Sequence, residues 1–240
     1  MRALRFLTIL CMGVCGYAFS TDLTAKSWAV SDGNGDIIQG SGVGSIRSIA
    51  SITKLMTVIV VLDSRQDLNE KIGRFTREQH IQLALVKSDN ASANLLCRKY
   101  VGGTPACVRA MNEKARYLGM IDTRYVEASG ISSDNVSTVI DLIKIVRAAK
   151  QYAPIVKASN TSFGSIKIKK KVYVYKNTNP IIQSRHDFLV SKTGTTHAAG
   201  GCLVMMLDTA IGERIIVILG SRNGKTRIPE ARQIIQNIPN

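Results

Sequence analysis

Aromatic residues and histidine are scarce in this chain, and each scarcity argues against a class of protein. Aromatic residues make up 5% of the 240 residues, and histidine occurs three times. Binding of single-stranded nucleic acid needs aromatic and basic residues interleaved on one surface, so we expect no nucleic-acid partner. The histidines, His80, His186 and His197, are far apart and share no metal-ligand spacing with the cysteines. We therefore expect no metal and no cofactor.

Long apolar runs are also lacking, apart from one at the N-terminus. Arg2 and Arg5 precede the apolar stretch Phe6–Val14, and Ala18 and Ser20 supply the small residues that a signal peptidase reads. Residues 1–20 are therefore predicted to be a signal peptide, with secretion across the inner membrane and a periplasmic location. The alternative is a retained N-terminal anchor, although the stretch is short for a membrane span.

Without this leader, three cysteines remain: Cys97, Cys107 and Cys202. An odd number makes a poor disulfide framework, although Cys97 and Cys107 can pair in an oxidising compartment. The alternative is that all three are small buried hydrophobic residues.

Positive charge is abundant, with a net charge of +15. Such a surface attracts polyanions over a long range, and export favours anionic lipid or cell-wall polymers over nucleic acid. The basic stretch Lys167–Lys171 is either a solvated strand face or an attachment to an anionic wall or membrane surface.

The pattern of apolar residues predicts an α+β fold. Residues 27–30 and 37–40 indicate two strands around a turn, and residues 52–62 a buried core helix. Residues 66–150 are predicted to be an inserted all-helical lobe, with helices starting near Thr104 and Thr138. Strand patterns follow residue 160, and an exposed-looking helix covers residues 229–238. We expect an antiparallel sheet built from residues 21–65 and 151–240 and flanked by helices.

The first candidate for chemistry is Ser51-Ile52-Thr53-Lys54, at the start of the core helix. A spacing of three places Ser51 and Lys54 on one helical face. A lysine in an apolar setting loses affinity for its proton, so it can accept one from the serine hydroxyl. The helix N-terminus adds positive potential where an oxyanion would form.

The second candidate, Ser88-Asp89-Asn90, lies between two helical stretches, where capping of the second helix is the alternative explanation. A copy of the tripeptide occurs at residues 133–135, so one of the two is incidental.

The third candidate is Lys192-Thr193-Gly194, after the strand at residues 188–190. Lysine offers a cation and threonine a hydroxyl to a substrate carboxylate, and glycine lets a ligand backbone approach the strand. The alternative is a solvated strand end.

Together the three motifs, in this order, are those of penicillin-binding proteins and class A β-lactamases. The chain resembles the D-alanyl-D-alanine carboxypeptidase family of serine DD-peptidases, and above all its small D-alanyl-D-alanine endopeptidase branch. The segments that carry the resemblance are residues 47–57, 85–91, 110–115, 118–120, 135–138, 176–179 and 192–200. The β-lactamase/DD-peptidase-like fold is what this resemblance implies.

The resemblance also implies the roles of the site residues. Ser51 is expected to be the nucleophile and Lys54 the base. Ser88, not the copy at residues 133–135, is expected to relay a proton to the leaving amine. Further expectations are that Asn90 bonds the substrate backbone, that Lys192 and Thr193 orient the peptide beside Gly194, and that the N–H groups of Ser51 and Thr195 hold the oxyanion. Peptidoglycan stem peptides and cross-links are the implied substrates, and β-lactam antibiotics the implied covalent inhibitors.

Two departures from the family pattern affect the expected substrate and location. The stretch Ser64–Leu83 is short, so a hairpin that usually flanks the cleft is expected to be trimmed, which favours an endopeptidase over a carboxypeptidase without deciding between them. The chain also stops soon after the expected sheet, and we expect a soluble periplasmic enzyme.

Two other functions remain open. A serine β-lactamase needs a deacylation base, for which Glu127 is the only nearby acid, in a different local context. A catalytically idle domain that binds β-lactams or cell wall would not need all three motifs intact.

Overall fold

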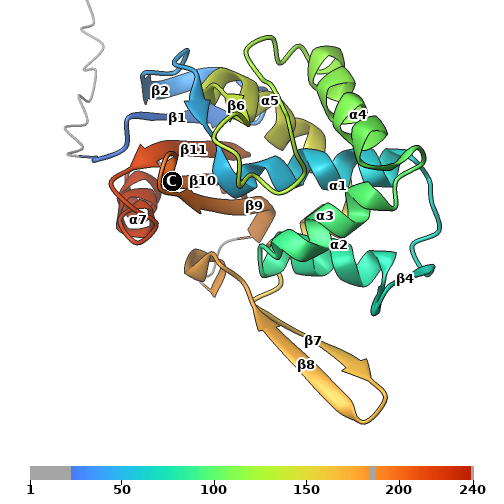
Figure 1. Cartoon of the computed structure of the whole chain (residues 1–240). Helices are drawn as coiled ribbons and strands as arrows, with labels where there is room; N and C mark the ends of the chain where they lie inside the picture. The colour runs from blue at the N-terminus through green and yellow to red at the C-terminus, as the bar shows by residue number, and fades with distance from the viewer. Residues whose placement is uncertain (1–22, 184–186, 239–240) are drawn as a thin grey trace, which may run out of the picture.

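The computed structural model describes residues 23–183 and 187–238 (Figure 1). The expected leader at residues 1–20 and His186 lie outside the described residues.

A five-stranded antiparallel sheet lies at the centre of the fold, in the strand order β2-β1-β11-β10-β9. β1 pairs with β11, with Ser27 opposite Leu219, so strands from the two ends of the chain lie side by side (Figure 1). The prediction of a sheet built from both ends is confirmed. The bounds are β1 Ser27–Asp32, β2 Ile37–Ser41, β9 Asp187–Thr196, β10 Gly200–Asp208 and β11 Arg214–Ser221.

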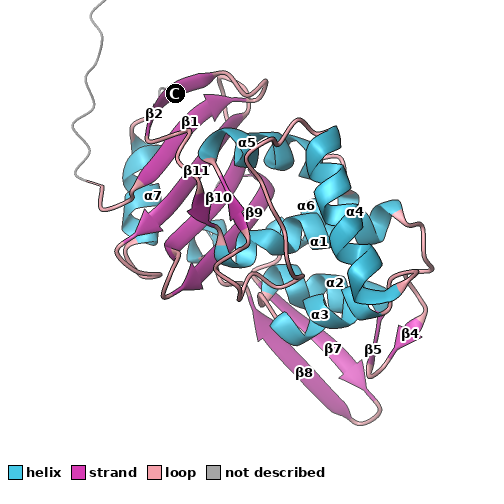
Figure 2. Cartoon of the chain, turned by 45° about the horizontal axis from the view of Figure 1, so that its top comes forward, coloured by secondary structure: helices cyan, strands magenta, loops and turns pink. Residues whose placement is uncertain are grey.

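The inner strands of the sheet are buried on both faces, and their alternate residues pack into two separate cores. On one face, Leu203 and Met205 of β10 pack in one cluster with Ala231 and Ile234 of the helix α7 (Arg227–Gln236). The opposite face packs against α5 (Val139–Ala149), and Figure 2 shows the two helices on opposite sides of the sheet. The interpretation of the C-terminal helix as exposed was therefore wrong, since one side of α7 completes the second core.

The remaining helices gather beside the sheet around α1 (Thr53–Asp63), which is buried from Thr53 to Val61, as expected of a core helix. They are α2 (Arg77–Val86), α3 (Asn90–Arg98), α4 (Gly103–Tyr117) and α6 (Ala153–Ser159). The helix predicted after Thr138 is confirmed, because Oγ1 of Thr138 accepts a hydrogen bond from N of Asp141 at 3.1 Å. α4 begins at Gly103, so Thr104 lies in its first turn and is not its N-cap.

Residues 66–150 are not helical throughout. A loop between α4 and α5 carries β6 (Val136–Ser137), which pairs with β3 (Arg47–Ser48) just before Ser51. Although α5 belongs to the range expected to form an inserted lobe, it packs against β1, β10 and β11. The domain boundaries stay a prediction.

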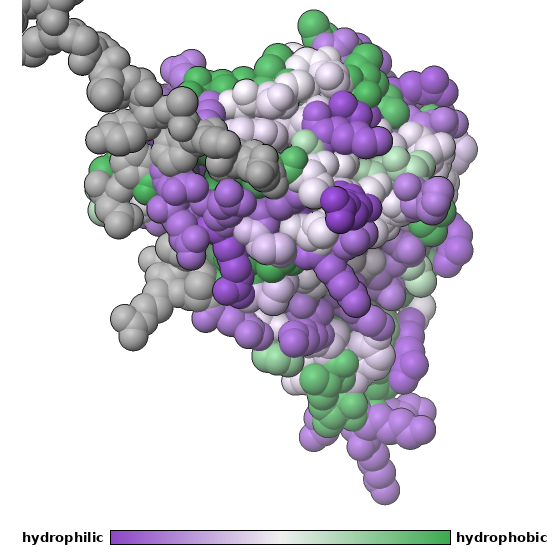
Figure 3. Space-filling view, turned by 90° about the vertical axis from the view of Figure 1, so that its left-hand side faces the viewer, coloured by the Kyte–Doolittle hydropathy of each residue, from purple (hydrophilic) through white to green (hydrophobic). Residues whose placement is uncertain are grey.

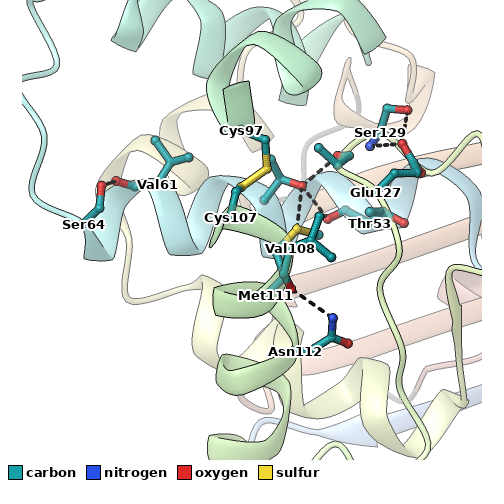
Figure 4. Close-up of a disulfide and its surroundings, with 12 residues drawn as sticks. Thr53, Val61, Ser64, Cys97, Cys107, Val108, Met111, Asn112, Glu127 and Ser129 are labelled. Atoms are coloured by element: carbon teal, nitrogen blue, oxygen red, sulfur yellow. Dashed lines mark hydrogen bonds between the residues drawn. A yellow bond between two sulfur atoms is a disulfide. The ribbon is translucent and has the colours of Figure 1, made fainter. Parts of the chain in front are cut away.

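A disulfide joins Cys97 of α3 to Cys107 of α4, with a Cα–Cα distance of 5.3 Å (Figure 4). Both residues are buried, and Cys202 is a buried free thiol. Pairing, and not mere burial, is thus the correct one of the two alternatives for Cys97 and Cys107.

Two hairpins stand outside the central sheet. The stretch expected to be trimmed holds the short pair β4 (Lys71–Ile72) and β5 (Phe75–Thr76). β7 (Phe163–Ile168) and β8 (Lys171–Lys176) form a longer hairpin that projects from the molecule (Figures 1 and 2). A turn of 3₁₀ helix, η2 (Pro180–Gln183), leads from it towards β9. In the described part of the chain, no helix has the length and hydrophobicity needed to cross a membrane.

Candidate active site

Ser51 and Lys54 lie where a 3₁₀ turn, η1 (Ala50–Ile52), runs into α1. Nζ of Lys54 donates to Oγ of Ser51 at 2.7 Å. Ala50, immediately before the serine, has a φ of +46°, a left-handed conformation that costs a non-glycine residue on the order of 1–3 kcal/mol. The packing of buried neighbours such as Ile49 and Ile52 holds this strained turn in place.

Lys54 is fully buried and uses all three of its N–H donors. Besides Ser51, its Nζ donates to Oδ1 of Asn90 at 2.7 Å and to the carbonyl oxygen of Ser129 at 2.5 Å. Burial lowers the pKa of Lys54 to about 8, and the negative charges of Glu127 and Asp89 partly oppose this effect. Near neutral pH a useful fraction of Lys54 is therefore uncharged and able to take a proton from Ser51.

The loop that supplies the Ser129 carbonyl is organised by Glu127 (Figure 4). The Glu127 carboxylate accepts from N of Ser129 at 2.7 Å, from Oγ of Ser129 at 2.6 Å and from N of Gly130 at 2.5 Å. It also accepts from Nδ2 of Asn135 at 2.9 Å. Gly130 has a φ of +81°, and a Cβ atom there would lie 1.9 Å from the carbonyl oxygen of Ala50. Only glycine allows the loop to lie so close to the nucleophile.

The two Ser-Asp-Asn copies have different surroundings. Ser88 lies between α2 and α3 with a φ of +60°, and Asp89 caps α3 by accepting from N of Ser92 at 2.8 Å. The capping explanation is therefore true of Asp89, while Asn90 contacts Lys54. In the second copy, the buried Asn135 braces the Glu127 loop and donates to Oγ1 of Thr53 at 3.0 Å. The second copy is thus part of the scaffold beneath the first motif.

The third motif lies on β9, an edge strand of the sheet. Lys192 is buried, and its Nζ donates to Oγ of Ser88 at 2.9 Å and to the carbonyl oxygen of Thr193 at 2.9 Å. Burial, followed by the charges of Lys54 and Arg227, holds the pKa of Lys192 well below its usual value.

The next residues of β9 adjoin the nucleophile. A Cβ atom on Gly194 would lie 2.9 Å from the backbone nitrogen of Ser51, so the two backbones are in close approach. Nη1 of Arg227, at the start of α7, donates to the carbonyl oxygen of Gly194 at 2.7 Å and also to Oγ1 of Thr195. Oγ1 of Thr193 lies 2.6 Å from Oγ1 of Thr178. All eight residues predicted for the site thus belong to one contiguous region.

Comparison with known proteins identifies the family. Residues 67–223 match the family described as D-alanyl-D-alanine carboxypeptidase. The chain is 34% identical over 243 residues to the D-alanyl-D-alanine endopeptidase of Pseudomonas aeruginosa, an alignment that covers 91% of this chain and 78% of that protein. This chain belongs to the D-alanyl-D-alanine carboxypeptidase family of serine peptidases. Within this family, the D-alanyl-D-alanine endopeptidase of Escherichia coli is 39% identical over 183 residues, which cover 67% of this chain and 59% of that protein.

Solved structures agree on the fold. The chain superimposes on a DD-transpeptidase of Streptomyces with a TM-score of 0.83 and 24% identity, over 90% of this chain and 97% of that one. The ampicillin-bound form of a penicillin-binding protein of Listeria monocytogenes gives a TM-score of 0.81 and 23% identity, with coverage of 90% and 97%. The predicted DD-peptidase-like fold is confirmed.

Sequence reasoning missed two members of this candidate site. Arg227 contacts Gly194 and Thr195, yet it lies 33 residues from Gly194 and follows no motif. Glu127 was weighed only as a deacylation base, whereas it shapes the loop that supplies a partner to Lys54. The one nearby signal in the sequence is Gly130, three residues after Glu127, because a glycine can mark a close approach of two backbone segments.

Proposed function

We propose that this chain is an exported serine DD-peptidase that cuts D-alanyl peptide bonds of peptidoglycan through an acyl-enzyme on Ser51. The observation that carries the proposal is the 2.7 Å hydrogen bond between Ser51 and a buried lysine whose pKa is lowered to about 8. A serine hydroxyl is a weak nucleophile unless an adjacent base removes its proton, and Lys54 is such a base.

In acylation, Oγ of Ser51 attacks the carbonyl carbon of the D-alanyl residue while Nζ of Lys54 takes the hydroxyl proton. The N–H groups of Ser51 and Thr195 stabilise the oxyanion; the close approach of Gly194 to Ser51 supports this assignment. The carbon–nitrogen bond then breaks, and Ser88 gives its hydroxyl proton to the leaving amine.

Lys192 restores the proton of Ser88 across the 2.9 Å hydrogen bond between them. The lowered pKa of Lys192 supports this step, because a destabilised ammonium group releases its proton readily. In deacylation water attacks the ester, its proton returns to Lys192 through Ser88, and Lys54 returns its proton to Ser51. The protons therefore balance over one cycle.

Asn90 bonds the substrate backbone in this proposal, and Thr193 binds a carboxylate of the peptide. β9 is an edge strand of the sheet, and an edge strand offers free backbone groups to an extended peptide. A peptide stem lying beside β9 would bring its D-alanyl carbonyl to Ser51.

Endopeptidase action on cross-links is the form of the activity that we favour, because the relatives at 34% and 39% identity are both named D-alanyl-D-alanine endopeptidases. The test is to incubate the enzyme with a cross-linked muropeptide dimer and with a monomeric pentapeptide. Mass spectrometry would show loss of the dimer for an endopeptidase. Loss of the terminal D-alanine from the pentapeptide alone would make it a carboxypeptidase.

β-Lactamase action is the alternative that the Glu127 contacts disfavour. Two oxygens that already accept four hydrogen bonds from the protein are poorly placed to activate a water. The experiment is intact mass of the protein after incubation with penicillin, beside a Ser51→Ala variant. A lasting adduct on the wild type alone supports the proposal. Consumed penicillin without an adduct would indicate a β-lactamase, and intact penicillin without an adduct would indicate an idle binding domain.

Export to the periplasm is proposed from the leader-like residues 1–20 and is supported by the disulfide between Cys97 and Cys107, since disulfides persist in oxidising compartments. Fractionation of cells expressing the full chain tests it. Recovery of a shortened protein from the periplasm is expected, whereas a full-length protein in the membrane would indicate a retained anchor.

A further inference from the structure

The β7–β8 hairpin has two unlike faces. Its inner face joins the main core, where Ile166 and Tyr175 are buried and Tyr173 packs near Phe75 with a ring separation of 5.9 Å. Tyr173 also accepts a hydrogen bond from Nζ of Lys87. The hairpin is therefore held firmly against the helical part of the molecule and is not a loose arm.

The outer face, in contrast, exposes apolar side chains. Phe163, Val172 and Val174 are 59%, 61% and 66% exposed. The register places Lys176 opposite Phe163, Lys167 opposite Val172 and Ser165 opposite Val174. Because alternate residues of a strand share one face, apolar and cationic side chains alternate across this surface. Figure 3 shows hydrophobic and hydrophilic residues side by side on the projection at the bottom of the molecule.

Charge on the hairpin is of one sign. Lys167, Lys169, Lys170, Lys171 and Lys176 are exposed, and residues 142–186 contain no aspartate or glutamate. Among the described residues, none of these five lysines forms an ion pair with a carboxylate. The outer face therefore combines exposed apolar side chains with lysines that have no carboxylate partner in the part of the chain that is described. A surface that is both anionic and apolar would complement it.

We propose that the outer face of the β7–β8 hairpin docks on the surface of a bilayer that contains anionic phospholipid. The lysines contact the headgroups, while Phe163, Val172 and Val174 enter the boundary between headgroups and acyl chains. A soluble polyanion would account for the lysines but leaves the three apolar side chains without a partner. This surface is separate from Ser51 and its motifs, so the proposal does not depend on the proposed reaction.

Docking would also set where the enzyme works. The strand β8 leads directly to Thr178, whose Oγ1 contacts Oγ1 of Thr193 at 2.6 Å. A hairpin held at the bilayer therefore keeps the candidate site near the membrane.

The test is co-sedimentation of the mature protein with vesicles of phosphatidylcholine, with and without phosphatidylglycerol. Binding is expected only with phosphatidylglycerol and is expected to weaken as salt rises. In the variant Lys167→Gln/Lys170→Gln/Lys176→Gln, which removes two lysines of the outer face and one of the hairpin turn, the affinity should fall on the order of 100-fold, from about fivefold per lysine. A Phe163→Thr/Val172→Thr/Val174→Thr variant should also lose binding, because threonine keeps strand propensity while removing apolar surface.

Matched controls use other exposed surfaces. Arg98→Gln/Arg109→Gln/Arg116→Gln removes the same charge from α3 and α4, and Val101→Thr/Ile121→Thr removes apolar surface elsewhere. Both should bind vesicles like the wild type, and all variants should react normally with penicillin. The proposal is overturned if no vesicle binds the wild type or if the arginine variant loses as much affinity as the lysine variant. It is equally overturned if the threonine triple variant binds normally while soluble heparin competes, since that would indicate a polyanion site.

Discussion

Nζ of Lys192 donates to Oγ of Ser88 at 2.9 Å across 104 residues of sequence, and so links the edge strand β9 to the turn between α2 and α3. The same turn leads into Asn90, which is bonded to Lys54. The two lysines are thereby connected through Ser88 and Asn90, two residues apart at one turn. A substitution of Lys54 or of Lys192 is therefore expected to disturb the position of the other lysine as well.

Acylation should depend on pH through Lys54. Its pKa falls from 10.5 to about 8 because the charged form is buried, so the neutral form that accepts a proton prevails only above about pH 8. The second-order rate of acylation by penicillin is expected to rise about tenfold per pH unit below this midpoint and then level off. Since folding disfavours the charged form, the contribution of Lys54 to stability also rises between about pH 8 and 10.5. A rate that is flat from pH 6 to 9 would rule out Lys54 as the base.

An Asn90→Asp variant should move that midpoint upwards. The new carboxylate would replace an amide oxygen that lies 2.7 Å from Nζ of Lys54, and a negative charge so close favours the protonated lysine. The acylation profile is expected to shift by about one pH unit or more towards alkaline pH. Asn94→Asp, which adds the same charge to an exposed position of α3, is the control and should leave the midpoint unchanged. Equal shifts in both variants would contradict the proposed contact.

A methyl group at Gly130 should damage the site more than one at Gly119. Both glycines have positive φ, so both variants carry the strain of a left-handed alanine, on the order of 1–3 kcal/mol. At Gly119 nothing lies within 4 Å of the new Cβ, whereas at Gly130 it would meet the carbonyl of Ala50 at 1.9 Å. Gly130→Ala is expected to lose more than about 3 kcal/mol of unfolding free energy or most of its acylation rate. Urea denaturation and penicillin labelling measure the two effects, and similar behaviour of the two variants would show that the loop does not support Ser51.

Loss of the disulfide should lower stability and leave the chemistry intact. A Cys97→Ala/Cys107→Ala variant is expected to lose about 2–4 kcal/mol of unfolding free energy, because the unfolded chain regains the freedom of a closed loop. Reduction of the wild type should have a similar effect in urea denaturation. Cys202→Ala, which removes a free thiol and leaves the disulfide in place, is the control. It is expected to lose reactivity towards thiol reagents and to keep its response to reduction. A double variant as stable as the wild type would show that the bond is incidental.

Much of the fold could be predicted because it follows from local patterns. The hydroxyl of Thr138 and the amide of Asp141, which form the cap of a helix, are only three residues apart. A short segment of sequence is therefore enough to predict where this helix begins. The strands of the sheet were visible for the same reason, as continuous apolar runs. The burial of Ala231 and Ile234 on one side of α7 could not be predicted in the same way. It depends on the sheet that packs against this helix, and the sheet is formed by residues distant in sequence.

The candidate site was predictable only where residues of defined chemistry recur at a fixed spacing. Ser51 and Lys54 are three residues apart, and the other motifs could be recognised as a set. Arg227 and Glu127 belong to no such pattern, since they act through backbone and side-chain contacts formed by folding. For the same reason, the different surroundings of Asn90 and Asn135 could not be derived from two identical tripeptides alone.

Three cations, Lys54, Lys192 and Arg227, lie close together, and the charges of Lys54 and Arg227 lower the affinity of Lys192 for its proton. Within the described residues, none of the three has an ion pair with aspartate or glutamate. This part of the site therefore favours the binding of a carboxylate, and a bound carboxylate stabilises the folded state by an amount that grows with the logarithm of its concentration relative to its Kd. Small inorganic anions would compete with a substrate carboxylate for these cations, so the ionic composition of the surrounding medium is expected to affect how fast the enzyme works.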